Sequence, residues 1–284
     1  MHQKNPMAAM LDEQRVPLGM QCFTGDEALI EVLGRTGFDF VMLDSEHCGL
    51  NPRAIEGAVR AAEVAGLIPI VRVPHAADET AIRRSLEAGA QGLVIPMVKS
   101  AADLSAVFDA AFFPPKGARG ICPAVRAAGY SFRTFGEYAQ WNNENILLIP
   151  LIEHPEAVEN IDEICAMDEV KIITFGQGDL AYAMGEGTAM LGSPKVRQAY
   201  KTVLAAAERH GVAVMGGPVL QPTPEACAKA VDDGIRVFCL GLDIMGFRNY
   251  CESTVSSLNA GLSLSEGAGG WTRPPAPASG FPGT

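Results

Sequence analysis

Short apolar runs alternate with amphipathic stretches along most of the chain. Each run has the length and the content of β-branched or aromatic residues typical of a buried strand, and each ends in a polar or glycine-containing segment. The runs cover residues 17–23, 38–43, 68–73, 92–97, 146–152, 171–175, 212–215 and 236–240. Between them, helical spacing predicts helices at residues 25–35, 52–65, 78–88, 101–111, 155–166, 194–210 and 223–233.

This alternation of strands and helices predicts an α/β fold, a closed parallel (β/α)8 TIM barrel. A doubly wound sheet would be favoured by a glycine-rich phosphate turn after the first strand, and residues 21–25 do not form one. We expect a leader at 1–15, whose residues 1–12 pack on the outside as a short helix, and a single catalytic barrel at 16–260. The Gly/Pro-rich residues 261–284 are expected to form a disordered tail.

One connection, residues 112–145, is far longer than an ordinary loop, which predicts a functional segment or an interface. The alternative is a surface excursion with solvated arginines. The side chains in it that would reach an anion are Arg119, Arg126, Tyr130 and Arg133.

Composition narrows the possible partners and the location. The net charge is -11 and Lys and Arg are scattered, which argues against nucleic acid and anionic membrane but not against a small anionic substrate. The seven cysteines contain no CxxC pair, so reduced thiols in the cytoplasm are expected. No signal peptide or apolar run of membrane-spanning length is recognisable.

Polar residues stand where the predicted strands end, the edge at which barrels carry their sites. Asp44, Glu46 and His47 follow the second run, and His47 is the natural proton carrier because its pKa is closest to neutral. The alternative is a solvated turn that caps the next helix. Arg72 lies in an apolar strand, where a guanidinium needs a carboxylate from Asp44 or from a substrate.

Two further carboxylates, Glu153 and Asp179, follow the fifth and sixth runs. With waters and substrate oxygens completing an octahedron, they suit Mg²⁺ or Mn²⁺. The alternative is that Glu153 is an acid in the first turn of a helix and that Asp179 caps one.

At these residues the chain resembles the HpcH/HpaI aldolase family of metal-dependent pyruvate aldolases, over about residues 16–250. The likeness is carried by FDFVMLDSEH, IPIVRVP, EAGAQGLVIPMV, PPKGARG, LIEHPEAVENIDEI and FGQGDLAYAMG, in the family's order. The resemblance implies a barrel of the phosphoenolpyruvate/pyruvate-binding type whose last helix is exchanged between subunits. It also implies a homo-oligomer, a hexamer built from three dimers.

By position, Glu153 and Asp179 resemble the family's metal ligands, for Mg²⁺ with Mn²⁺ or Co²⁺ as alternatives. Arg72 resembles the arginine that holds the keto oxygen, and His47 resembles the base. The resemblance also implies that Asp44 orients Arg72, that Glu87 supports the histidine of a neighbouring subunit, and that Gly178 and Asp179 bind the substrate carboxylate. We further expect Gln177 and Arg126 to contact the substrate.

The implied activity is reversible aldol cleavage of a 2-keto-4-hydroxy acid to pyruvate and an aldehyde, through a metal-stabilised enolate. One alternative is a relative that uses oxaloacetate, as a decarboxylase or as a synthase like macrophomate synthase or the siderophore citrate synthases. Another is a barrel that binds keto acid without turnover. Leu151, Gln177 and Cys122 depart from residues common in the family, which bears on substrate fit more than on metal chemistry.

Overall fold

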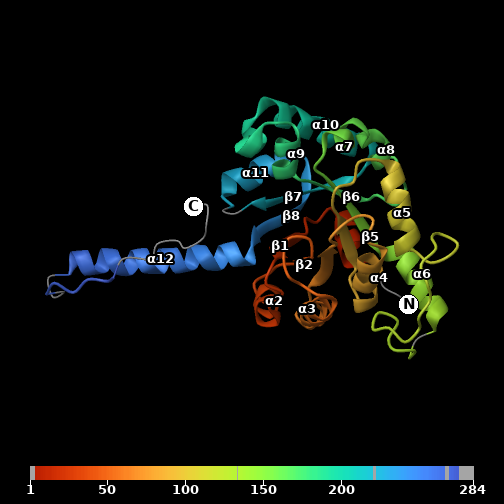
Figure 1. Ribbon diagram of the computed structural model, residues 1–284, viewed down its shortest axis with the longest axis horizontal. Coiled ribbons are helices and arrows are strands. Elements are labelled where there is room, and N and C mark those ends of the chain that lie inside the picture. Colours follow the sequence, from red (N-terminus) through yellow and green to blue (C-terminus); the bar gives the residue numbers. More distant parts are fainter. Residues whose placement is uncertain (1–3, 133, 220–221, 266–268, 275–284) are drawn as a thin grey trace. The chain divides into compact units, whose positions relative to one another are not determined.

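A computed structural model gives the structure of the protein and describes residues 4–132, 134–219, 222–265 and 269–274. The chain divides into two compact units, Met1–Asp243 and Ile244–Thr284. The first unit holds all the strands of the described chain (Figure 1).

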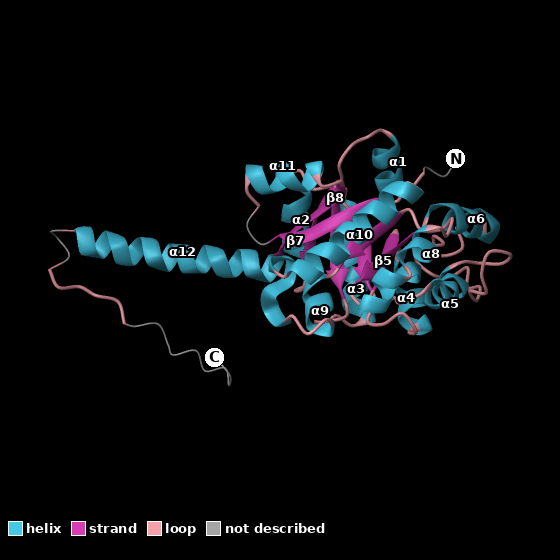
Figure 2. Cartoon of the chain, turned by 90° about the horizontal axis from the view of Figure 1, so that it is seen from above, coloured by secondary structure: helices cyan, strands magenta, loops and turns pink. Residues whose placement is uncertain are grey.

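The first unit is a closed barrel in which eight described strands, all parallel, neighbour one another in sequence order. Helices surround the strands (Figure 2). Every predicted apolar run overlaps one strand, so the predicted (β/α)8 barrel is confirmed. The strands are β1 (Leu18–Cys22), β2 (Phe40–Asp44), β3 (Ile68–Arg72), β4 (Gly92–Ile95), β5 (Leu147–Ile152), β6 (Ile172–Phe175), β7 (Ala213–Val219) and β8 (Ile235–Leu242).

Most predicted helices are present with bounds within two residues of those expected. They begin at side-chain caps such as Asn51 and Ser193, whose oxygens accept first-turn amides, each followed by a proline. The helices of the barrel unit are α1 (Pro6–Asp12), α2 (Glu27–Gly34), α3 (Pro52–Val64), α4 (Glu79–Ala88), α5 (Ala101–Ala111), α6 (Phe135–Asn145), α7 (Pro155–Glu159), α8 (Ile161–Cys165), α9 (Gln177–Ala183), the 3-10 helix η1 (Gly187–Gly192), α10 (Pro194–His210) and α11 (Pro224–Asp232).

Two helical regions differ from the sequence expectation. The stretch expected as one helix at 155–166 forms two, α7 and α8, which meet at Asn160. The long connection at 112–145 ends in a helix, α6, that was not predicted. The sequence contains a signal for it, a cap residue, Thr134, three positions before an acid, Glu137. In the structure the Thr134 hydroxyl accepts the Glu137 amide at 3.4 Å.

The barrel interior is built from alternate residues of the strands. In register, Phe40 neighbours Ile68 and Met42 neighbours Ile70, and these four belong to one buried apolar cluster. Met7 of α1 is fully buried in the same cluster. The leader therefore contributes to the core, whereas the sequence had suggested an outer covering.

The second unit begins in α12 (Asp243–Leu264), which carries large apolar side chains at several positions. Phe247, Tyr250 and Leu258 are 62%, 69% and 52% exposed. The last turn of α12 takes in residues 261–264, which were expected in the tail. The rest of that expected tail lies mostly outside the described residues, at 266–268 and 275–284.

Within the described ranges, no helix combines the length and the apolar character needed to cross a membrane.

Candidate active site

The strand register carries polar residues to the carboxyl end of the barrel. Asp44 neighbours Arg72 directly on β2 and β3, two residues beyond the apolar Met42–Ile70 pair. On β5, Leu147, Ile149 and Leu151 face the interior cluster. Because side chains alternate along a strand, a residue two positions beyond Leu151 continues that face. That residue is Glu153.

Both oxygens of the Asp44 carboxylate are engaged, although the side chain is fully buried. Its Oδ1 accepts the backbone amides of Glu46 at 2.8 Å and His47 at 3.1 Å. Its Oδ2 contacts Arg72 Nη2 and accepts the amide of Gln21 at 2.8 Å. Burial by itself would raise the pKa of Asp44, but the hydrogen bond and charge of Arg72 and the two backbone amides outweigh it, so the pKa lies below its ordinary value.

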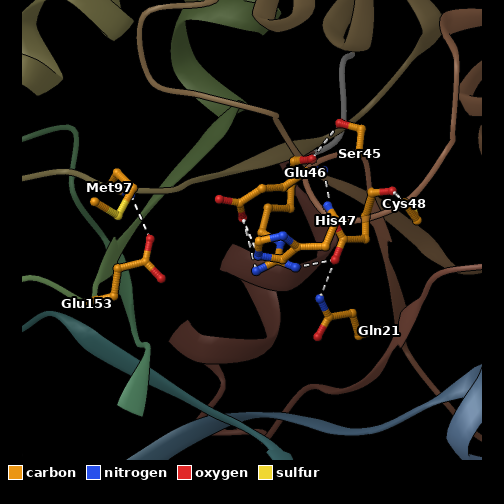
Figure 3. Close-up of polar contacts among 9 residues, drawn as sticks. Gln21, Ser45, Glu46, His47, Cys48, Met97 and Glu153 are labelled. Atoms are coloured by element: carbon orange, nitrogen blue, oxygen red, sulfur yellow. Dashed lines mark hydrogen bonds and ion pairs between the residues drawn. The ribbon is translucent and has the colours of Figure 1, made fainter. Parts of the chain in front are cut away.

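Arg72 links Asp44 to a second carboxylate. Its Nη1 lies 3.2 Å from Oε2 of Glu46, and His47 Nε2 lies 3.6 Å from the same oxygen. Glu46 is 15% exposed, and its pKa is raised by burial and by the charges of Asp44 and Asp179, against the lowering effect of Arg72 and His47. Figure 3 shows Gln21, Glu46 and His47 gathered on one side of the site and Glu153 with Met97 on the other.

Two buried polar atoms in this cluster have no hydrogen bond within the described protein. They are Arg72 Nε and Glu46 Oε2. The contact of Glu46 Oε2 with Arg72 Nη1 is an ion pair that lacks hydrogen-bond geometry. Buried polar groups are costly unless they find a partner. Their placement at the mouth of the barrel is what a site for a polar ligand requires.

Glu153 is buried on the far side of the cluster, with 3% of its surface exposed. Its Oε1 accepts the Met97 amide at 2.7 Å. Met97 has φ 55, the left-handed region that non-glycine residues seldom adopt. Burial, followed by the charges of Glu46 and Asp179, raises the pKa of Glu153 to about 7.

Asp179 lies in the first turn of α9, which follows β6 through Gly176. The first hydrogen bond of the helix is donated by the Leu180 amide to Gly176 at 3.2 Å, so the amides of residues 177–179 precede it. The space above Gly178 is open, because a Cβ there would meet no atom closer than Met190 Cε at 4.0 Å.

The carboxylates fit a hard divalent cation. The charges of Glu46 and Asp179 both raise the pKa of the buried Glu153, which marks a concentration of negative charge that a cation relieves. Among the described residues, no three His, Cys, Asp or Glu side chains form a set able to hold a metal ion. Glu153 and Asp179 would therefore need substrate or water oxygens to complete the coordination of Mg²⁺.

Other predicted residues lie elsewhere in the single chain. Arg126 donates to Glu63 Oε1 at 3.1 Å and to the Ala88 carbonyl at 2.8 Å, at the ends of α3 and α4. Glu87 lies in the same α4 turn, where its carbonyl accepts the Ala127 amide at 3.0 Å. Neither joins the Asp44–Arg72 cluster within one protomer, so their roles toward substrate stay predictions.

Two more residues proposed for an anion in the long connection, Arg119 and Tyr130, have local partners. Arg119 is 4% exposed and donates to Asn142 at 2.8 Å and Tyr138 at 3.2 Å, which ties the connection to α6. The Tyr130 hydroxyl accepts from Arg60 at 2.9 Å. Arg133 lies outside the described residues.

The sequence reasoning missed two groups in the site. Gln21 had a signal, since an amide inside an apolar strand needs a buried partner. The Met97 amide had no sequence signal, because the residue type does not show that a backbone N–H points into the site through an unusual φ.

The sequence and the structure of the chain are similar to those of known proteins. The chain is 31% identical over 245 residues, 86% of its length and 93% of the relative, to a 5-keto-4-deoxy-D-glucarate aldolase of Salmonella paratyphi C (strain RKS4594). It is similar to the crystal structure of an HpcH/HpaI aldolase from Desulfitobacterium hafniense DCB-2, with a TM-score of 0.82 and 27% identity, covering 92% of this chain and 98% of that one. It is also similar to macrophomate synthase, with a TM-score of 0.79 and 27% identity, covering 90% and 88%.

The family model for HpcH/HpaI aldolase/citrate lyase matches residues 20–249, which contain the barrel except for the first two residues of β1, and every side chain of the candidate site. The resemblance seen in the sequence motifs is thereby confirmed, and the chain belongs to the HpcH/HpaI aldolase/citrate lyase family.

Proposed function

We propose that the protein is a divalent-metal-dependent aldolase that reversibly cleaves a 2-keto-4-hydroxy acid to pyruvate and an aldehyde. Within its family, whose curated relatives include aldolases, it is a carbon–carbon lyase. The observation that carries the proposal is the placement of Arg72, which Asp44 and Glu46 hold within electrostatic reach of Glu153.

In this mechanism Arg72 binds the keto oxygen. Its Nη2 contacts Asp44 and its Nη1 forms an ion pair with Glu46, and its buried Nε–H has no hydrogen-bond partner in the described protein, so this group can donate to a ligand. When the C3–C4 bond breaks, its electron pair moves into the enolate and negative charge develops on the keto oxygen. A fixed guanidinium stabilises that charge.

His47 receives the proton of the 4-hydroxyl group as the aldehyde carbonyl forms. Its ring is exposed at the barrel mouth, with Glu46 Oε2 3.6 Å from Nε2. Such a position allows proton exchange with solvent between turnovers. In the reverse direction the same imidazole returns the proton to the new hydroxyl.

The keto acid would be held across the barrel mouth between β3 and α9. A divalent cation bound by Glu153 and Asp179, Mg²⁺ in preference to Mn²⁺ or Co²⁺, would polarise the carboxylate and keto oxygens of the substrate. The first-turn amides at Gly178 and Asp179 would bind the substrate carboxylate, with the Gln177 side chain beside them.

The likeness to macrophomate synthase favours one alternative, an enzyme that uses oxaloacetate as a decarboxylase or a carbon–carbon bond-forming synthase. Incubation with oxaloacetate, with and without an aldehyde, separates the two. Pyruvate and aldehyde from a 2-keto-4-hydroxy acid support the aldolase, whereas turnover of oxaloacetate alone supports the alternative.

The deciding experiment for the aldolase is exchange of pyruvate methyl protons for deuterium, followed by NMR with Mg²⁺ or Mn²⁺ and then with excess chelator. We expect exchange that depends on metal and is lost in Glu153→Ala and Asp179→Ala. Absence of exchange with both metals would remove the pyruvate-aldolase proposal.

We also propose a homo-hexamer in which α12 is exchanged between subunits. The exposed Phe247, Tyr250 and Leu258 support it, because large apolar side chains gathered on one helix favour a protein partner. Light scattering tests the mass of the assembly, and Phe247→Glu should dissociate it.

A cytoplasmic location is part of the proposal, supported by seven free cysteine thiols, all among the described residues.

A further inference from the structure

Gln21 is a buried polar residue on a strand of the barrel. It lies on β1, where its register neighbour on β2 is Met42, a member of the interior cluster. Residues in register on parallel strands face the same side of a sheet, so Gln21 points into the barrel. It is 3% exposed. An amide there is costly unless it is hydrogen-bonded, and its donor reaches Asp44 Oδ2 at 2.8 Å.

This contact completes the fixation of one carboxylate. Oδ1 of Asp44 is held by two backbone amides, and Oδ2 is shared by Gln21 and Arg72. Without the Gln21 donor, Oδ2 would be held by Arg72 alone, and the carboxylate would lose one of the four contacts that fix its orientation. The direction of Arg72 Nε, a buried donor with no hydrogen-bond partner in the described protein, would change with it.

We propose that Gln21 is a positioning residue for catalysis, which acts through Asp44 to aim the Arg72 guanidinium at the keto oxygen. It touches neither substrate nor metal in this role. The inference rests on the proposed aldolase function for its effect on rate, but its effect on the placement of Arg72 does not depend on that function.

The first test compares Gln21→Met with Thr174→Val. Methionine keeps the length of the side chain and removes the donor. Thr174 is a matched control because it is a buried polar residue in the barrel, 7% exposed, whose hydroxyl donates to the Met215 carbonyl at 3.1 Å. For Gln21→Met we expect kcat for aldol cleavage to fall at least about tenfold while KM changes less than about threefold, since misplaced catalytic groups cost rate more than ground-state binding.

Thr174→Val should lower the melting temperature without this kcat loss. If Gln21→Met lost no more kcat than Thr174→Val, Gln21 would be a structural residue and the inference would be wrong.

A second variant, Gln21→Glu, tests the donor itself. A protonated glutamic acid can donate to Asp44 as the amide does, whereas an ionised one repels it. The other titratable or charged groups around Asp44 are Arg72 on β3 and Glu46, His47 and Cys48 in the loop after β2. We expect kcat of Gln21→Glu, divided by that of the wild type at each pH, to rise as the pH is lowered. A ratio that is flat with pH would contradict the donor role.

Crystal structures of the wild type and of Gln21→Met separate this inference from the aldolase proposal. We expect the Asp44 carboxylate to turn and Arg72 to move in the variant, whatever reaction the enzyme catalyses. If wild-type protein failed to exchange pyruvate protons but Arg72 moved, the aldolase proposal would fall and the positioning role would stand. An unmoved Arg72 would overturn the positioning role.

Discussion

Asp44 and Arg72 form a buried ion pair between neighbouring positions of β2 and β3, with side chains 0% and 11% exposed. Register places the two side chains on the same face of adjacent strands. The pair lies directly above the apolar interior of the barrel, so each charge depends on the other for compensation. It therefore links the stability of the barrel to the arrangement of the site.

Asp44→Asn should destabilise the protein and change its acid unfolding. Removing one partner of a buried ion pair costs about 3 kcal/mol. The lowered pKa of Asp44 stabilises the folded state above its ordinary value of 3.8, and this contribution is lost as pH falls through the folded value. Denaturant unfolding from pH 7 to pH 3 should show a flatter pH dependence in the variant than in the wild type. Equal slopes would contradict the pair's role.

Glu153→Gln should stabilise the metal-free protein at alkaline pH. Because the pKa of Glu153 is raised to about 7 from 4.5, its contribution to stability is full below 4.5 and is lost as pH rises through 7. Without metal, the variant should melt above the wild type at pH 8 and close to it at pH 5. Mg²⁺ should raise the melting temperature of the wild type alone, and less so below pH 7, where protons compete with the cation.

Gly176→Ala should weaken metal binding by displacing Glu153. A Cβ at residue 176 would lie 2.6 Å from Glu153 Cβ and 2.9 Å from its Oε2. Gly178→Ala is the matched control, two residues away on α9, since its Cβ would have 4.0 Å of clearance. Calorimetric titration with Mn²⁺ should show at least about a tenfold loss of affinity in the first variant and little change in the second. Equal affinities would argue against Glu153 as a ligand.

Mixed oligomers should reveal whether Glu87 acts on a neighbouring subunit. Within one chain Glu87 lies in α4 and does not join the His47 cluster. His47→Ala and Glu87→Ala should each be nearly inactive alone. Co-expressed in equal amounts, they should regain about a quarter of wild-type activity, because random pairing unites an intact His47 with a neighbour's intact Glu87 at about that frequency. No recovery in assembled hexamers would remove the shared site.

The barrel and most of its site residues were predictable because their signals are local. A buried parallel strand is a short apolar run, and a helix has a 3.6-residue period with cap residues at its start. The strand ends at Asp44 and Glu153 are visible as an abrupt change from apolar to ionisable residues. Family motifs at the same positions added roles that spacing alone left open.

The tertiary structure decided the contacts between residues that are far apart in the chain. Gln21 and Asp44 are 23 positions apart, and Met97 and Glu153 are 56 apart. Both contacts depend on barrel closure and strand register, which no local pattern encodes. The same holds for the contact of Arg126 with Glu63, residues that are 63 positions apart.

The sequence by itself determined which residues form strands and which charges stand at their ends, since these follow from the period and length of apolar segments. Only the tertiary structure decided which of those charges meet. Two charged side chains on neighbouring strands meet only where the strands lie in a particular register. Burial then favours their pairing, because an unpaired buried charge is costly. For that reason the need of Arg72 for a carboxylate such as Asp44 was foreseeable, whereas the contacts of Arg72 with Glu46 and of Asp44 with Gln21 were not.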